Sequence, residues 1–147
     1  MASKWFTVKT LYRSYAEGRP EKPDLAYDPD ATAVEERILL IKAKSKEDAA
    51  SKAEREAKDY AEKGTCHNPY NQKIVTYYTG YQDIYEIQGN LSDKREIFST
   101  TRIISKRVAD KKIAHIYMGK RKFSYGKGKR RKFINREYTP TGERGLQ

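Results

Sequence analysis

The positive charge of this chain is concentrated at one end. Residues 1–104 hold 17 Lys and Arg against 17 Asp and Glu, so this part of the chain is neutral. Residues 105–147 hold 14 Lys and Arg against 3 Asp and Glu, which accounts for the whole formal net charge of +11. Such a break in charge indicates a boundary in organisation. We therefore expect a small domain over residues 1–104 and a basic extension over residues 105–147.

Composition excludes several classes of protein. Aromatic residues make up 12% of the 147 residues, which argues against a wholly disordered chain. No apolar run approaches the roughly 20 residues that cross a bilayer, and no signal-peptide core follows Met1. Cys66 is the one cysteine, so an internal disulfide framework is excluded. These features predict a cytoplasmic protein in a reducing compartment.

Two strands are predicted in the first third of the chain. Residues 4–13 alternate between apolar and polar positions, which is typical of a half-buried strand. The residues on its apolar face are Phe6, Val8, Thr10 and Tyr12. Residues 17–31, rich in Pro and Asp, predict a loop. Residues 34–44 predict the second strand, and because its apolar run Ile38–Ile41 occupies both faces, we expect it to be central in the sheet.

A helix is predicted between residues 45 and 64. Ser45, followed by Glu47 and Asp48, resembles a capping box at a helix start. Small and aromatic residues then recur at helical spacing and form a stripe that suits close packing on a sheet. This stripe consists of Ala49, Ala53, Ala57 and Tyr60. Gly64 is expected to end the helix, because glycine accepts the left-handed conformation that is common there.

Two further strands are predicted after a loop at residues 65–72. Residues 73–88 are rich in Tyr, Ile, Val and Thr, and Gly80 inside this run indicates a bulge. Residues 95–104 predict the fourth strand. The resulting order β-β-α-β-β predicts an α+β fold, in which one helix packs on a two-layer antiparallel sheet.

The basic extension fits more than one structure. Residues 106–118 match a short helix through Ala109, Ile113 and Ile116, and match equally a strand around Ile113–Met118. Residues 121–138 match either a hairpin that turns at Gly126–Gly128 or a segment that orders only on a partner.

Several blocks within residues 4–103 carry a resemblance to a known family. They are Trp5–Tyr12, Val34–Leu40, Ala43–Ala49, Asp83–Ile87 and Glu96–Ser99. Together they resemble the bacterial family called domain of unknown function 4288. That family has no assigned activity, so the resemblance supports the fold and implies no catalytic residue. It does not extend to residues 105–147.

The extension is the strongest candidate for a binding site. Its cations would neutralise phosphates and release counterions, while its aromatic rings would stack on unpaired bases. The predicted nucleic-acid-binding residues are Lys120, Arg121, Lys122, Phe123, Tyr125, Lys127, Lys129, Arg130, Arg131, Lys132 and Phe133. The alternatives are an acidic protein or another polyanion as the partner, or a solubilising tail without a partner.

A second candidate is the run Glu35-Glu36-Arg37. A pair of carboxylates serves acid–base catalysis when both reach one substrate. On a strand, however, Glu35 and Arg37 share a face and Glu36 takes the other. We favour a structural reading, in which Arg37 pairs with Glu96 or Glu86 across the sheet.

Nucleophile and metal chemistry have weak signals. Cys66 and His67 are neighbours in a loop, whereas a catalytic Cys–His pair normally meets from separate segments. Ser99 lacks the glycine elbow that exposes a nucleophilic serine. One cysteine and two histidines do not provide a zinc-ligand spacing. We therefore predict no metal, no cofactor and no catalytic residue.

The tyrosines of residues 73–88 offer a different binding surface. Tyr77, Tyr81 and Tyr85 share one parity, and a tyrosine ring combines an apolar body with a polar hydroxyl. Such a face suits protein binding, although ordinary sheet packing uses the same residues.

The sequence therefore predicts a protein that works by binding and not by catalysis, with RNA or DNA as the partner of its extension. The alternative is a protein-interaction module, such as an inhibitor, an immunity-type partner or a phage–host factor, that binds an acidic protein. Exposed sheet edges are also compatible with a homodimer.

Overall fold

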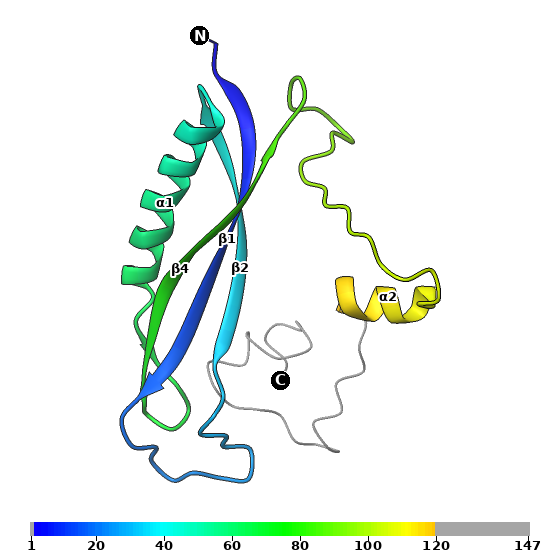
Figure 1. Cartoon of the computed structure of the whole chain (residues 1–147). Helices are drawn as coiled ribbons and strands as arrows, with labels where there is room; N and C mark the ends of the chain where they lie inside the picture. The colour runs from blue at the N-terminus through cyan, green and yellow to red at the C-terminus, as the bar shows by residue number, and fades with distance from the viewer. Residues whose placement is uncertain (1, 120–147) are drawn as a thin grey trace.

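The computed structural model describes residues 2–119 of the chain (Figure 1). Its elements are β1 (Lys4–Glu17), β2 (Ala33–Ala43), α1 (Lys46–Lys63), β3 (Cys66–His67), β4 (Lys73–Glu86) and α2 (Asp110–Tyr117). The hairpin predicted at residues 121–138 lies outside the described residues, as do the nucleic-acid-binding residues predicted between Lys120 and Phe133. No helix in the described part of the chain has the length and apolarity that crossing a membrane requires.

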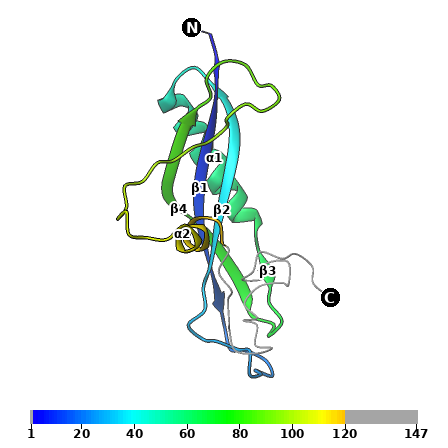
Figure 2. The same cartoon turned by 90° about the vertical axis from the view of Figure 1, so that its right-hand side faces the viewer.

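The predicted α+β fold is confirmed. The strands form one antiparallel sheet in the order β2-β1-β4-β3, and α1 covers one face of it (Figures 1 and 2). β1 is the central strand that pairs with both long neighbours. The alternation predicted for residues 4–13 holds, since Phe6, Val8 and Tyr12 are fully buried on the helix-covered face.

The alanine stripe brings α1 close to the sheet. Ser45 begins the helix as predicted, because its hydroxyl accepts a hydrogen bond of 3.1 Å from the Asp48 N–H. The buried helix residues are Ala49, Ala53, Ala57 and Ala61. Two of them pack in a cluster with Phe6 and Val8, and the other two pack around Tyr12. Short side chains therefore set the small spacing between helix and sheet.

The sequence predicted a left-handed helix end at Gly64 and a bulge at Gly80, and only the bulge is confirmed. The helix ends before Gly64, but the φ of Gly64 is −85°, so the left-handed conformation that we expected is absent there. Gly80 has a φ of +88° and lies within a bulge of β4, as predicted. At this bulge the Thr79 hydroxyl donates to the Leu11 carbonyl at 2.8 Å and replaces the interrupted ladder bond.

The prediction that the second strand is central was wrong, because β2 is an edge strand of the sheet. Its apolar run does face both ways. Leu39 and Ile41 pack toward α1, whereas Ile38 and Leu40 point to the other face and are about half exposed, at 53% and 52%. The apolar run on both faces therefore did not mark a central strand, and it leaves two apolar side chains half exposed on the face that α1 does not cover.

The fourth strand was also predicted in the wrong place. Residues 95–104 form no strand, and the fourth strand is instead the two-residue β3, within the loop predicted at residues 65–72. β3 occupies the edge of β4 near Lys73 and Ile74. The β-branched residues of 95–104 have the propensity for a strand, but propensity without a pairing partner does not form one.

Of the two structures that fitted residues 106–118, the helix is the one observed, as α2. This helix buries none of its residues and packs against none of the other described helices and strands. Figures 1 and 2 show it standing apart from the sheet, on the side opposite α1.

Candidate binding surface

The sheet has one face without a helix, which we call the open face. It carries the odd-numbered residues of β1 and the residues that pair with them on β2 and β4. The large side chains exposed on it are Tyr15, Val34, Ile38, Leu40, Tyr77 and Tyr81. Tyr81 is 74% exposed and Val34 is 61% exposed. Exposed apolar and aromatic side chains gathered on one face of a sheet are typical of an interaction site.

Residues 88–104, the crossing segment, cover one end of the open face. The Thr7 hydroxyl donates to the Ile97 carbonyl. The Phe98 ring lies 6.0 Å from the Tyr85 ring, between centroids, and the Lys9 ammonium lies 5.3 Å from the Phe98 centroid. The crossing segment therefore covers the open face near β1 and β4 and leaves the β2 side of the face uncovered by described residues.

The three tyrosines predicted as a binding face all lie on the open face. Tyr77 and Tyr81 are exposed, while Tyr85 is half-buried beside Phe98. The exposed rings of Tyr77 and Tyr81 are accessible to a partner, and their role in binding stays a prediction. The aliphatic half of the surface, which β2 contributes, was missed because the second strand was taken as central.

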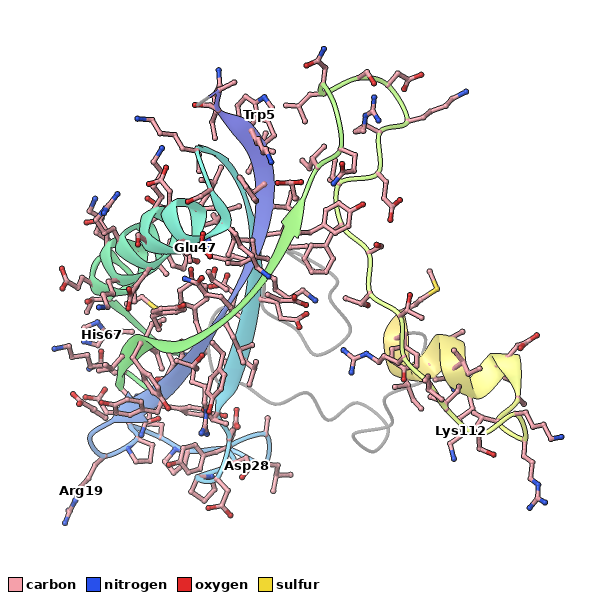
Figure 3. All side chains as sticks on the ribbon, turned by 45° about the horizontal axis from the view of Figure 1, so that its top comes forward. Trp5, Arg19, Asp28, Glu47, His67 and Lys112 are labelled. Carbon is pink, nitrogen blue, oxygen red and sulfur yellow. The ribbon has the colours of Figure 1, made fainter. Side chains whose placement is uncertain are left out.

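The described start of the basic extension is strongly exposed. Its exposed cations are Lys106, Arg107, Lys111 and Lys112. Figure 3 shows Lys112 projecting from α2, which stands apart from the sheet. The guanidinium of Arg102 lies 5.6 Å from the Tyr117 ring centroid and holds the preceding loop against the helix. A cation–π contact between Arg102 and Tyr117 is therefore present near the start of the basic extension.

The Glu35-Glu36-Arg37 run is divided between the two faces, as predicted. On the helix side, the Tyr60 hydroxyl donates to Glu35 Oε1 at 2.8 Å. On the open face, Glu36 pairs with the Lys9 ammonium at 3.6 Å. The two carboxylates therefore point away from each other and do not form an acid–base pair on one substrate.

The partner predicted for Arg37 was wrong. Arg37 lies on the helix side, where it pairs with Glu56 at 3.5 Å, donates to the Tyr12 hydroxyl at 3.2 Å and stacks 3.6 Å from the Tyr60 centroid. Burial alone would lower the pKa of Arg37, but the bond to Tyr12 and the neighbouring tyrosines and Glu56 raise it overall. Glu56 and Tyr60 of α1 lie close to Arg37, and their contacts with it hold α1 against β2.

Glu86, one of the two acids predicted to pair with Arg37, bonds elsewhere. The Lys4 ammonium donates to Glu86 at 3.2 Å, and this bond holds the pKa of the Glu86 carboxyl below its ordinary value. The ion pair joins the start of β1 to the end of β4 at an exposed position.

Cys66 and His67 form the short strand β3, in which Cys66 is half-buried and His67 is exposed. Among residues 2–119 no three His, Cys, Asp or Glu side chains gather closely enough to hold a metal ion. Sequence reasoning missed the buried polar turn that follows. There, Asn68 accepts hydrogen bonds from the N–H groups of Tyr70 and Gln72 at 3.0 and 2.9 Å. The Asn-Pro-Tyr sequence was the available signal for such a turn.

The turn anchors the long loop that precedes β2. The Tyr70 hydroxyl donates to Asp24 at 2.6 Å, and the ring meets Tyr27 edge-on at 5.0 Å between centroids. Burial, together with the bond to Asp24, raises the pKa of Tyr70 far above its ordinary value. This cluster explains why a loop rich in Pro and Asp is held in place.

Comparison with known proteins gives one match. Residues 5–99 match the family model described as "Domain of unknown function (DUF4288)". No curated protein and no solved structure matches the chain. The match covers the sheet, α1 and most of the crossing segment, and it ends before α2 and the basic extension.

Proposed function

The chain belongs to the DUF4288 family, and we propose that it is a non-enzymatic nucleic-acid-binding protein whose basic extension grips the phosphate backbone. The observation that carries this proposal is the segregation of charge. Residues 105–147 account for the entire net charge of +11. A surface that serves solubility alone has no need to collect its cations at one end of the chain.

The described part of the extension supports the proposal. α2 packs against no other described element, so its lysines face solvent and are free to approach a polyanion. Lys106, Arg107, Lys111 and Lys112 are exposed, and Arg102 lies over the Tyr117 ring. A mixture of cations and rings recurs in the sequence beyond residue 119. Phosphate contacts supply affinity without sequence preference, and aromatic rings favour single-stranded partners.

In the proposed mechanism two basic runs neutralise phosphates. The first is Lys120–Lys122 and the second is Lys127–Lys132, while Phe123, Tyr125 and Phe133 stack on bases. Gly126, between the runs, and Gly128, within the second run, would let the backbone approach the nucleic acid closely.

The test is a binding titration of the full chain with a fluorescent single-stranded oligonucleotide at two salt concentrations. A variant with Gln at Lys127, Lys129, Arg130, Arg131 and Lys132 is expected to lose most of the binding. Its matched control places Gln at five exposed cations of the domain. These are Lys44, Lys46, Arg55, Lys58 and Lys73. Wild-type affinity is expected to fall about a hundredfold or more between 50 and 200 mM salt. Affinity that is insensitive to salt, or equal losses in both variants, would refute the proposal.

A second candidate function rests on the open face. The exposed surface formed by Ile38, Leu40, Tyr77 and Tyr81 suits a protein partner, and the basic extension would add attraction to an acidic one. Replacing Tyr77 and Tyr81 with Ser discriminates between the two candidates. Loss of a captured protein without loss of oligonucleotide binding favours the second candidate, and the reverse favours the first.

A further inference from the structure

The outer edge of β2 carries backbone groups that have no partner strand among the described residues. Two hydrogen bonds show toward which neighbouring strand each backbone group of β1 points. The carbonyls of Trp5 and Leu11 are bonded on the β4 side, by the Ile87 N–H and by the Thr79 hydroxyl. Odd-numbered residues of β1 therefore bond toward β4, and even-numbered ones bond toward β2.

The pairing of β1 with β2 then gives the hydrogen-bonding direction of each residue of β2. Phe6 lies opposite Ile41 and Val8 lies opposite Leu39, so the odd-numbered residues of β2 bond to β1. Its even-numbered residues therefore direct their N–H and C=O groups outward. These residues are Val34, Glu36, Ile38, Leu40 and Lys42. Consistent with this direction, the Lys42 carbonyl accepts from the Lys52 side chain at 2.7 Å.

The edge lacks the proline and the bulge that protect many natural edge strands. β2 runs for 11 residues without Pro or Gly, and of its outward carbonyls only that of Lys42 is bonded by a described side chain. The exposed Ile38 and Leu40 flank its middle. A long, regular and partly apolar edge of this kind is a template for another strand.

We propose that this edge pairs with the same edge of a second copy of the chain. The two β2 strands would run antiparallel about a twofold axis at Leu39, and the two sheets would join into one continuous sheet. Because the directly opposed residues lie on the same face, both α1 helices would cover the same side.

A second copy is the proposed partner because, in this register, the side chains of β2 are complementary to those of another β2. On the open face, Glu36 of each copy lies opposite Lys42 of the other, and Ile38 lies opposite Leu40. Each complementary pair therefore occurs twice. The Glu36 N–H would then donate to the Lys42 carbonyl that Lys52 now occupies.

The neighbouring registers are poorer. On the open face, an axis at Ile38 places Glu36 opposite Leu40, and an axis at Arg37 places Glu36 opposite Ile38. An axis at Leu40 places Lys42 opposite Ile38. Opposite charges and apolar pairs stabilise directly opposed positions, whereas like charges destabilise them.

The test is the mass of the nuclease-treated full chain, measured by light scattering and sedimentation at micromolar to about 100 µM concentration. Wild type is expected to be a dimer. Glu36→Lys and Lys42→Glu each create two like-charge pairs, and each is expected to weaken dimerisation roughly ten- to thirtyfold. An equimolar mixture of the two variants restores both complementary pairs, so it is expected to form a heterodimer. Glu54→Lys, on the exposed face of α1, is the matched control and should dimerise like wild type.

A proline provides a second, independent variant. The N–H of Ile38 points away from β1, so Ile38→Pro removes an outward donor and spares the bonds within the chain. This variant is expected to be a folded monomer by circular dichroism. A monomeric wild type would overturn the proposal. It would also be overturned by single charge variants as dimeric as wild type, by their failure to pair on mixing, or by a folded Ile38→Pro dimer.

Discussion

At the scale of single residues, Tyr70 couples the ordering of a loop to pH. Its folded-state pKa is raised by burial and by the bond to Asp24, whereas in the unfolded chain it titrates near its ordinary value of about 10. The stability that Tyr70 contributes is therefore complete below about pH 10 and is lost as pH rises above it. We expect Tyr70→Phe to show a smaller loss of unfolding free energy between pH 9 and 11 in urea titrations. Tyr81→Phe, at an exposed ring, should behave like wild type, and an equal alkaline loss in Tyr70→Phe would contradict this prediction.

Arg37 is the residue that joins β2 to α1. Its guanidinium contacts the Tyr60 ring, the Tyr12 hydroxyl and Glu56, so Arg37→Ala removes a stacked cation and a hydrogen bond together. Since the Tyr12 hydroxyl keeps its bond to Thr10, we expect a moderate cost of about 1–2 kcal/mol in unfolding free energy. Arg37→Lys should recover only part of it, because an ammonium does not reproduce the planar stacking. Arg55→Ala, on the exposed side of α1, is the control, and a similar cost there would contradict the assignment.

At the scale of elements, the spacing between α1 and the sheet depends on the alanine stripe. Ala53 is fully buried in the cluster that includes Phe6 and Val8. Ala53→Val adds two methyl groups at this fully buried position, and we expect the overpacking to lower the unfolding free energy by about 1–3 kcal/mol. Arg55→Val, on the exposed side of α1, also replaces a strong helix former with a β-branched residue, and it does so without the packing conflict. Chemical denaturation of both variants should separate the two effects, and equal costs would show that the stripe has room.

Elements that are fixed by their own residues were predictable, and those fixed by distant partners were not. The Ser45 cap, the alanine stripe, the alternation of Phe6 and Val8 and the Gly80 bulge are local patterns, and each appears in the structure. The edge position of β2 and the missing strand at residues 95–104 depend on which other strand lies alongside. Local propensity does not contain that information, so the aliphatic part of the open face was missed together with it.

At the scale of the whole molecule, the two proposals combine into one prediction. A dimer paired through β2 carries two basic extensions, and two linked contacts on one strand bind more tightly than one. Ile38→Pro keeps the extension intact and removes only the pairing. We therefore expect it to bind an oligonucleotide of about 10 nucleotides, too short for both extensions, with wild-type affinity. For a strand of about 40 nucleotides, we expect its affinity to be roughly ten times or more below that of wild type. Fluorescence anisotropy with both lengths at one salt concentration makes the comparison. An equal loss on the short strand would mean that the substitution damages the nucleic-acid contact itself, and unchanged affinity for the long strand would mean that the two extensions act independently.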